Sequence, residues 1–129
     1  MKVIEQNYTI HAPIDVVWEA LTDKTHIEKW TGSPAILDDQ EGTEFSLWDG
    51  DIHGKNLEVL EQDELIQEWF SGDWAEPSKV TFTFRAKDDK TTIHIFHENV
   101  PEEDVENISL EWKDSFMEPL KAYIESELV

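Results

Sequence analysis

The sequence predicts an α+β fold in which a curved antiparallel sheet wraps around a long C-terminal helix. Three observations predict it. The chain begins with a strand and two short helices, its middle alternates short strands with turn residues, and its end carries a continuous apolar stripe at helical spacing. Such a helix must bury its stripe, and a strongly bent sheet of about six to seven strands provides the surface that buries it.

The first part of the chain shows the strand and the two short helices. Residues 3–10 alternate roughly between apolar and polar side chains, as in a half-buried strand. Pro13 suits the first turn of a helix, because its missing N–H costs nothing there. The apolar residues of this helix recur at i, i+3, i+4 and i+7: Ile14, Val17, Trp18 and Leu21. We expect a second short helix over residues 24–31 that ends at Gly32.

The middle of the chain predicts an antiparallel meander. The expected strands are residues 35–37, 44–48, 52–61, 65–70, 80–86 and 91–98. The Asp-Gly dipeptide at 49–50 and the polar pairs at 63–64 and 88–89 are typical of tight turns. Connections this short exclude parallel crossovers. A longer loop over residues 70–78 carries Trp74, which we expect to be exposed.

Residues 101–129 predict one long helix. Three acidic residues, 102–104, lie near the positive end of its dipole. Its apolar stripe consists of Val105, Ile108, Trp112, Phe116, Leu120, Tyr123, Ile124 and Leu128. Pro119 interrupts the stripe, and we expect it to free the carbonyl of Ser115 and to kink the helix.

Composition excludes several classes of partner. The chain has 30 acidic and 10 basic residues and a formal net charge of −20, so nucleic acids and anionic membranes should repel it. It has no cysteine, which excludes disulfides, thiolate metal cages and a cysteine nucleophile. No signal peptide and no run of about 18 apolar residues occurs, so we expect a soluble, cytoplasmic protein. No repeat or linker is visible, and we expect residues 1–129 to form a single domain.

Several motifs follow one another in a characteristic order. Residues 42–54, GTEFSLWDGDIHG, match the pattern G-x-x-F-x-(M/L)-F-D-G-x-(I/V)-x-G closely, and residues 66–70, IQEWF, form a strand that ends near a tryptophan. Residues 99–101 and 112–121 correspond to G-V-P and W-x-x-x-F-x-x-P-(L/I)-K. Together these motifs resemble the activator of heat-shock protein 90 ATPase homologue family, of the C-terminal-domain type. Asn99 replaces the usual Gly, which is tolerable because Asn adopts left-handed conformations.

This resemblance implies the helix-grip fold of the START and birch-pollen-allergen superfamily (SRPBCC). In the two-domain cochaperone, an additional N-terminal domain carries a basic motif needed to stimulate the chaperone's ATPase, and we expect no counterpart of it here. A protein-interaction module that contacts heat-shock protein 90 is one functional hypothesis, connected with the stress response. The high negative charge makes docking on an acidic chaperone electrostatically awkward. The superfamily's cyclases and hydrolases suggest a further hypothesis, an enzyme that uses His97 with Glu58 or Glu68.

Aromatic residues support the main hypothesis, a non-enzymatic domain that binds a small hydrophobic molecule. Six side chains from separate elements should converge between the sheet and the C-terminal helix: Trp30, Trp69, Phe82, His97, Trp112 and Phe116. His97 should point inward, because it shares one strand face with Ile93 and Ile95. Ligand pockets are mostly apolar with few polar groups, and His97 would supply one. A densely packed core without a cavity is the alternative.

No catalytic residue, cofactor or metal ligand is predicted. The five His lack zinc-ligand spacing, and the chain contains no calcium loop, phosphate loop or nucleophile elbow. Glu58 and Glu68 lie within expected strands. Each lines the cavity as a general base or lies on the outer face of a half-exposed sheet. Most other acidic residues gather in turns and on polar faces, as on a solvated surface.

Overall fold

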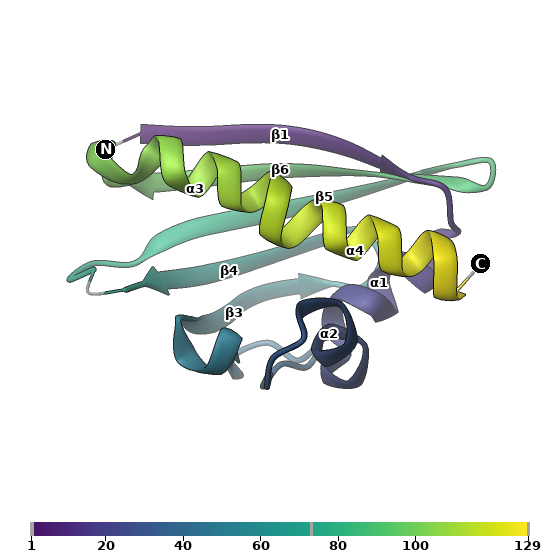
Figure 1. The fold of residues 1–129 in the computed structure, drawn as a ribbon, viewed down its shortest axis with the longest axis horizontal. Helices are drawn as coiled ribbons and strands as arrows, with labels where there is room; N and C mark the ends of the chain where they lie inside the picture. The colour runs from purple at the N-terminus through teal and green to yellow at the C-terminus, as the bar shows by residue number, and fades with distance from the viewer. Residues whose placement is uncertain (1, 73, 129) are drawn as a thin grey trace.

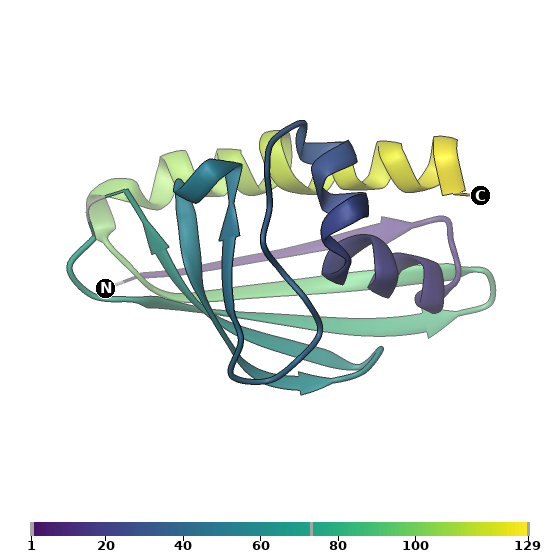
Figure 2. The ribbon, with the colours of Figure 1, turned by 90° about the horizontal axis from the view of Figure 1, so that it is seen from below.

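Six antiparallel strands form one curved sheet in the order β1-β6-β5-β4-β3-β2. The computed structural model describes residues 2–72 and 74–128. The strands are β1 (Lys2–Ile10), β2 (Glu44–Leu47), β3 (Ile52–Leu60), β4 (Glu64–Ser71), β5 (Ser78–Lys87) and β6 (Lys90–Val100). Figures 1 and 2 show the C-terminal helix lying along one face of this sheet, so the α+β helix-grip fold is confirmed.

Two short helices follow β1 as predicted. These helices are α1 (Ile14–Thr22) and α2 (Lys24–Thr31). Asp23 separates them, and its carboxylate caps α2 by accepting a hydrogen bond from the Thr25 N–H at 2.8 Å. Gly32 ends α2 in the left-handed conformation, with φ at 73°. Both helices pack against the C-terminal part of the long helix and close one end of the sheet (Figure 1).

The C-terminal helix passes through five segments: η2 (Glu102–Asp104), α3 (Val105–Glu111), η3 (Trp112–Met117), α4 (Glu118–Tyr123) and η4 (Ile124–Leu128). The segments η3 and η4 are π-helical turns. Pro119 stands in the first turn of α4, directly after η3. The prediction of a kink at Pro119 is wrong, because the helix continues without a sharp bend in Figure 2. The wide π turn accommodates the missing proline N–H.

Two predictions about the middle of the chain are wrong. Residues 35–37 form no strand, and only an isolated bridge joins Ile36 to Ser46. This segment is short and follows Pro34, whose nitrogen cannot donate to a ladder. Trp74 is half-buried rather than exposed: its indole N–H donates to the Asp104 carboxylate at 2.9 Å, and its ring packs against the core. The sheet therefore has six strands, and Trp74 ties a loop to the start of the long helix.

The β2–β3 connection bends sharply at the predicted Asp-Gly dipeptide. It forms the short 3₁₀ turn η1 (Trp48–Gly50). Trp48 and Asp49 both have left-handed backbones, with φ at 50° and 56°. This conformation is uncommon for a residue as bulky as tryptophan. The turn places the Trp48 ring against Trp30 and Phe116, with ring centroids 6.5 and 6.1 Å apart.

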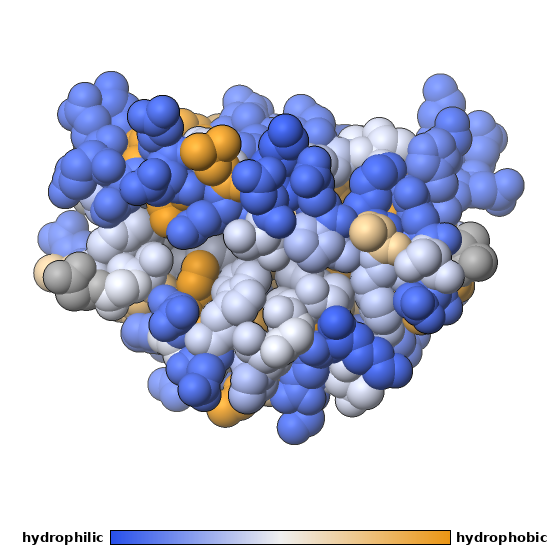
Figure 3. All heavy atoms as spheres, in the orientation of Figure 1, coloured by the Kyte–Doolittle hydropathy of each residue, from blue (hydrophilic) through white to orange (hydrophobic). Residues whose placement is uncertain are grey.

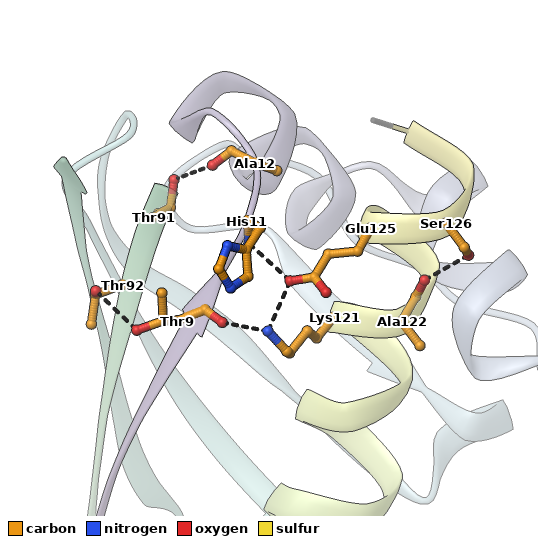
Figure 4. Close-up of polar contacts among 9 residues, drawn as sticks. All are labelled: Thr9, His11, Ala12, Thr91, Thr92, Lys121, Ala122, Glu125 and Ser126. Atoms are coloured by element: carbon orange, nitrogen blue, oxygen red, sulfur yellow. Dashed lines mark hydrogen bonds and ion pairs between the residues drawn. The ribbon is translucent and has the colours of Figure 1, made fainter. Parts of the chain in front are cut away.

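Polar contacts fasten the C-terminal end of the long helix to the end of β1 (Figure 4). Lys121 Nζ donates to the Thr9 carbonyl at 2.7 Å and pairs with Glu125 at 2.8 Å. The backbone N–H of His11 donates to the same Glu125 carboxylate at 2.8 Å. Burial raises the pKa of Glu125, but the hydrogen bonds from His11 and Lys121 outweigh burial and hold that pKa below its ordinary value.

The surface reflects the acidic composition. Figure 3 shows strongly hydrophilic side chains along the upper part and the edges of the face that carries the long helix, side chains of intermediate hydropathy over its middle, and small, separate apolar patches. Within residues 2–72 and 74–128, no helix combines the length and the apolar character needed to cross a bilayer.

Candidate functional site

All six side chains predicted to converge meet in one buried aromatic cluster between the sheet and the long helix. Trp112 lies at its centre, with ring centroids 4.8 Å from both Trp69 and Phe116 and 5.6 Å from Phe82. Trp30 packs edge-on against Phe116 at 4.9 Å, and His97 packs edge-on against Trp112 at 5.8 Å. Such offset and edge-to-face contacts add to the stability that burial alone provides.

The centre of this cluster is filled. Next to Trp30, Phe82 and Phe116, the void between the sheet and the helix has a volume of only about 10 Å³. A space of this size is at the lower limit for a single water molecule. Large rings occupy the space at this place, as the packed-core alternative expects, and the cavity hypothesis therefore depends on the space farther along the helix.

A pocket of about 380 Å³ instead opens at the side of the cluster, between the first half of the long helix and the ends of β3 and β4. Its apolar lining comes from six side chains: Trp48, Ile52, Trp69, Ile108, Trp112 and Phe116. Its polar lining comes from Asp51, Ser71, Gly72, Glu111 and Ser115. Of the predicted site residues, Trp69, Trp112 and Phe116 line this pocket. Trp30, Phe82 and His97 belong to the aromatic cluster but do not line the pocket.

His97 is a buried structural link rather than a pocket residue. It is fully buried, its Nδ1 accepts a hydrogen bond from the Trp112 indole N–H at 2.9 Å, and its Nε2 lies 2.7 Å from the Ser78 hydroxyl. Because Nδ1 is an acceptor, the neutral ring carries its proton on Nε2. The Ser78 hydroxyl in turn donates a hydrogen bond to the Trp69 carbonyl at 3.1 Å. Burial lowers the pKa of His97 from 6.5 to about 4.

A second buried chain of hydrogen bonds holds Trp69. Its indole N–H donates to Gln67 Oε1 at 2.8 Å, and Gln67 Nε2 donates to Asn56 Oδ1 at 2.9 Å. Asn56 then donates to the Asp38 carbonyl at 2.9 Å. The indole N–H groups of Trp69 and Trp112 therefore both point to partners in the interior. These two residues therefore present ring carbons, and not N–H groups, to the pocket.

We predict that His97 makes stability depend on pH between 6.5 and 4. Its pKa of about 4 in the folded protein lies below the ordinary value of 6.5, so the unfolded chain binds this proton more tightly. The stability linked to His97 is fully present above pH 6.5 and is lost as the pH falls toward 4. The pKa difference corresponds to about 3 kcal/mol. Guanidinium unfolding at several pH values should show this loss in the native protein.

The His97→Gln variant is the control for this prediction, because it keeps a polar side chain but cannot titrate. Its stability should change less with pH than that of the native protein over the same window. NMR of the imidazole should show the Nε2–H tautomer at pH 7 and a midpoint near pH 4. A midpoint near the ordinary value of 6.5 would contradict the prediction.

The two strand carboxylates do not form a catalytic pair with His97. Glu58 is exposed, and Glu68 is half-buried in a second hollow on the side of the sheet that carries His53 and Phe70. The hydrogen-bond partners of the His97 ring are Trp112 and Ser78. Within the described residues, His97 therefore lacks a carboxylate partner, and the enzyme hypothesis gains no acid–base arrangement from this histidine.

Three residues near the junction of α1 and α2 lie close enough to share a metal ion: Glu19, Asp23 and His26, whose potential ligand atoms lie within 4.8 Å of one another. No linear zinc motif in the sequence indicates this group, because the turn between two helices brings it together. Both carboxylates are exposed, and the His26 ring already contacts Glu19 at 3.5 Å and the Tyr123 hydroxyl at 2.7 Å. We assign no ion to it.

Comparison with known families agrees with this geometry. The family model described as "Activator of Hsp90 ATPase homolog 1-like protein" matches residues 11–125. The chain belongs to this family. The match includes all four motifs, at residues 42–54, 66–70, 99–101 and 112–121, so the resemblance inferred from them is confirmed.

Curated relatives of this Hsp90-activator-like domain are longer proteins. "Uncharacterized protein C1711.08" of Schizosaccharomyces pombe is 29% identical over 120 residues, which cover 92% of this chain and 36% of the relative. "Activator of 90 kDa heat shock protein ATPase homolog 2" of Mus musculus is 25% identical over 114 residues, covering 87% of this chain and 34% of the relative. The chain thus spans about a third of the length of these curated relatives.

Solved structures share the whole fold. The crystal structure of PFC0360w, an HSP90 activator from Plasmodium falciparum, has a TM-score of 0.85 and 27% identity, and covers 99% of this chain and 96% of that one. The solution structure of the Aha1 dimer from Colwellia psychrerythraea has a TM-score of 0.84 and 17% identity, and covers 98% of each chain. At this lower identity the second similarity is one of fold.

Proposed function

We propose that this domain binds a small, mainly apolar molecule in the side pocket next to the aromatic cluster, without transforming it. The observation that carries the proposal is an aromatic-walled pocket of about 380 Å³. This volume lies in the lower part of the range of about 300–1,000 Å³ that is usual for small-molecule sites. Six of the eleven lining residues are apolar, and apolar residues are also the larger part of the lining in most such sites.

The walls of the pocket are held in place before any ligand arrives. Trp69 and Trp112 stack on each other at 4.8 Å, and buried hydrogen bonds to Gln67 and His97 restrain their rings. Phe116 packs against both at 6.0 and 4.8 Å. Binding of a ligand therefore costs little conformational entropy in these side chains, and this low cost favours affinity.

The test is a titration of tryptophan fluorescence and of indole N–H signals in NMR. The panel contains a fatty acid, a sterol, an aromatic polyketide and a hydrophobic amine. A Ser115→Phe variant should weaken binding at least about tenfold, because the ring would occupy the pocket. Lys113→Phe is the matched control, since Lys113 is exposed in the same π turn but does not line the pocket.

Two results would contradict the proposal. One is that no compound of the panel changes the spectra of the native protein. The other is that a compound binds with equal affinity to the native protein and to Ser115→Phe.

A second candidate function is interaction with Hsp90. It is favoured by relatives such as the one named "Activator of 90 kDa heat shock protein ATPase homolog" in Dictyostelium discoideum, and by the Plasmodium structure described as an HSP90 activator. The test combines capture of the cognate Hsp90 with its ATPase rate in the presence of this chain. Capture with a raised rate supports an activator, whereas capture without a raised rate supports only a binding module. Neither capture nor a changed rate would contradict this candidate.

A further inference from the structure

We infer that the side pocket selects a small organic cation, an ammonium group attached to an apolar body. This inference rests on the proposed function and names the class of ligand. Among the residues that the structure describes, the titratable groups that line the pocket are Asp51 and Glu111, and no lysine, arginine or histidine lines it. A positive ligand would therefore meet two carboxylates, and a negative ligand would find no partner of opposite charge.

The aromatic walls favour a cation independently of these carboxylates. Trp48, Trp69, Trp112 and Phe116 line the pocket, and they come from three separate parts of the chain. Aromatic faces carry a partial negative charge that attracts cations, with tryptophan the strongest. Trp48 is half-buried, whereas the other three rings are at most 4% exposed, so Trp48 is the ring that a cation can reach most readily. The N–H groups of Trp69 and Trp112, which would favour an anion, are already donated to Gln67 and His97 in the interior. The two polar hydroxyls, those of Ser71 and Ser115, can accept as well as donate.

The charge of the whole chain acts in the same direction. A formal net charge of −20 produces a negative potential that raises the local concentration of cations and lowers that of anions. Asp51 and Glu111 are exposed at the rim, so water and salt screen their individual contributions. An apolar body on the ligand is still needed, because most of the lining is aromatic or aliphatic.

Three compounds of nearly equal shape test the inference. The cation is (3-hydroxyphenyl)trimethylammonium, its neutral isostere is 3-tert-butylphenol, and the anion is 3-hydroxybenzenesulfonate. Calorimetry at low ionic strength should show the cation binding about tenfold more tightly than the neutral compound. The anion should bind most weakly. Added salt should weaken binding of the cation and leave that of 3-tert-butylphenol nearly unchanged.

Variants of the rim separate charge from shape. Glu111→Gln and Asp51→Asn should each weaken binding of the cation about two- to fivefold and leave binding of 3-tert-butylphenol unchanged. Glu106→Gln is the matched control, because Glu106 is exposed on the same helix but does not line the pocket. It should leave all three affinities unchanged apart from a small effect of the overall charge.

The outcomes distinguish this inference from the proposed function. If 3-tert-butylphenol binds as tightly as the cation, or if the anion binds best, the cation selectivity is wrong while the pocket still binds small molecules. If none of the three compounds binds, the inference is wrong, and the broader panel with Ser115→Phe decides whether the pocket binds anything.

Discussion

Replacing Gly54 by alanine is expected to lower the free energy of unfolding by about 3 kcal/mol, the upper end of the range for overpacked sites. A Cβ on Gly54 in β3 would overlap the carbonyl oxygen of Glu68 in the neighbouring strand β4 and would lie 2.7 Å from its carbonyl carbon. The overlapped atoms belong to the backbone of β4, so a change of side-chain rotamer cannot relieve the overlap. The two strands must therefore move apart. Guanidinium unfolding at neutral pH measures the loss.

Gly42→Ala is the control for the Gly54 prediction. Gly42 has φ at 83°, but a Cβ there would meet no atom within 4 Å. Alanine should therefore cost only about 1 kcal/mol at this position, from the left-handed backbone alone. A Gly54→Ala variant as stable as Gly42→Ala would contradict the steric explanation. The strand shift should also displace Trp69, which follows Glu68, so ligand affinity should fall in Gly54→Ala.

Replacing Trp112 by alanine is expected to lower the free energy of unfolding by about 3–5 kcal/mol. Trp112 is 2% exposed, and it contacts Trp69, Phe82, Phe116 and His97. Its removal leaves a cavity at the centre of the cluster and leaves His97 Nδ1 without its donor. Urea unfolding with a probe other than tryptophan fluorescence, such as far-ultraviolet circular dichroism, measures the effect.

Two further variants separate the contributions of Trp112. Leu110 lies on the same helix, and its side chain is 54% exposed. Leu110→Ala should therefore change the free energy of unfolding by less than about 0.5 kcal/mol. Trp112→Phe keeps an aromatic ring but removes the N–H donor, so its cost should lie between those of the two alanine variants. It should also raise the pKa of His97, because Nδ1 then becomes free to take a proton. A Trp112→Ala variant as stable as Leu110→Ala would contradict the central role of this ring.

Local patterns in the sequence were sufficient to predict most of the fold. The helical spacing of Ile14 to Leu21 and the alternation of Ile93, Ile95 and His97 identify buried faces, and the structure buries Val17, Trp18, Leu21 and these three β6 residues. The failures have local causes as well. Residues 35–37 are apolar but too short to form a strand after Pro34, and Pro119 is accommodated by a π turn that periodicity does not reveal.

The candidate site was predictable only in part. Convergence of Trp69, Trp112 and Phe116 followed from the order of strands and helix, but the exact packing of their rings did not. That packing fills the centre and leaves the pocket at the side. Trp48 was missed because its position depends on a left-handed turn, for which tryptophan carries no sequence signal. Asp51 and Glu111 were missed because 30 acidic residues give no reason to single out two.

Taken alone, the sequence determined the α+β helix-grip fold, the family motifs and the strongly acidic character of the chain. It could do so because periodicity, turn chemistry and charge are properties of neighbouring residues. Only the tertiary structure decided that His97 is a neutral link between Trp112 and Ser78 and that the pocket lies beside the aromatic cluster. Those features depend on burial and ring packing among residues far apart in the chain, and no local pattern specifies them.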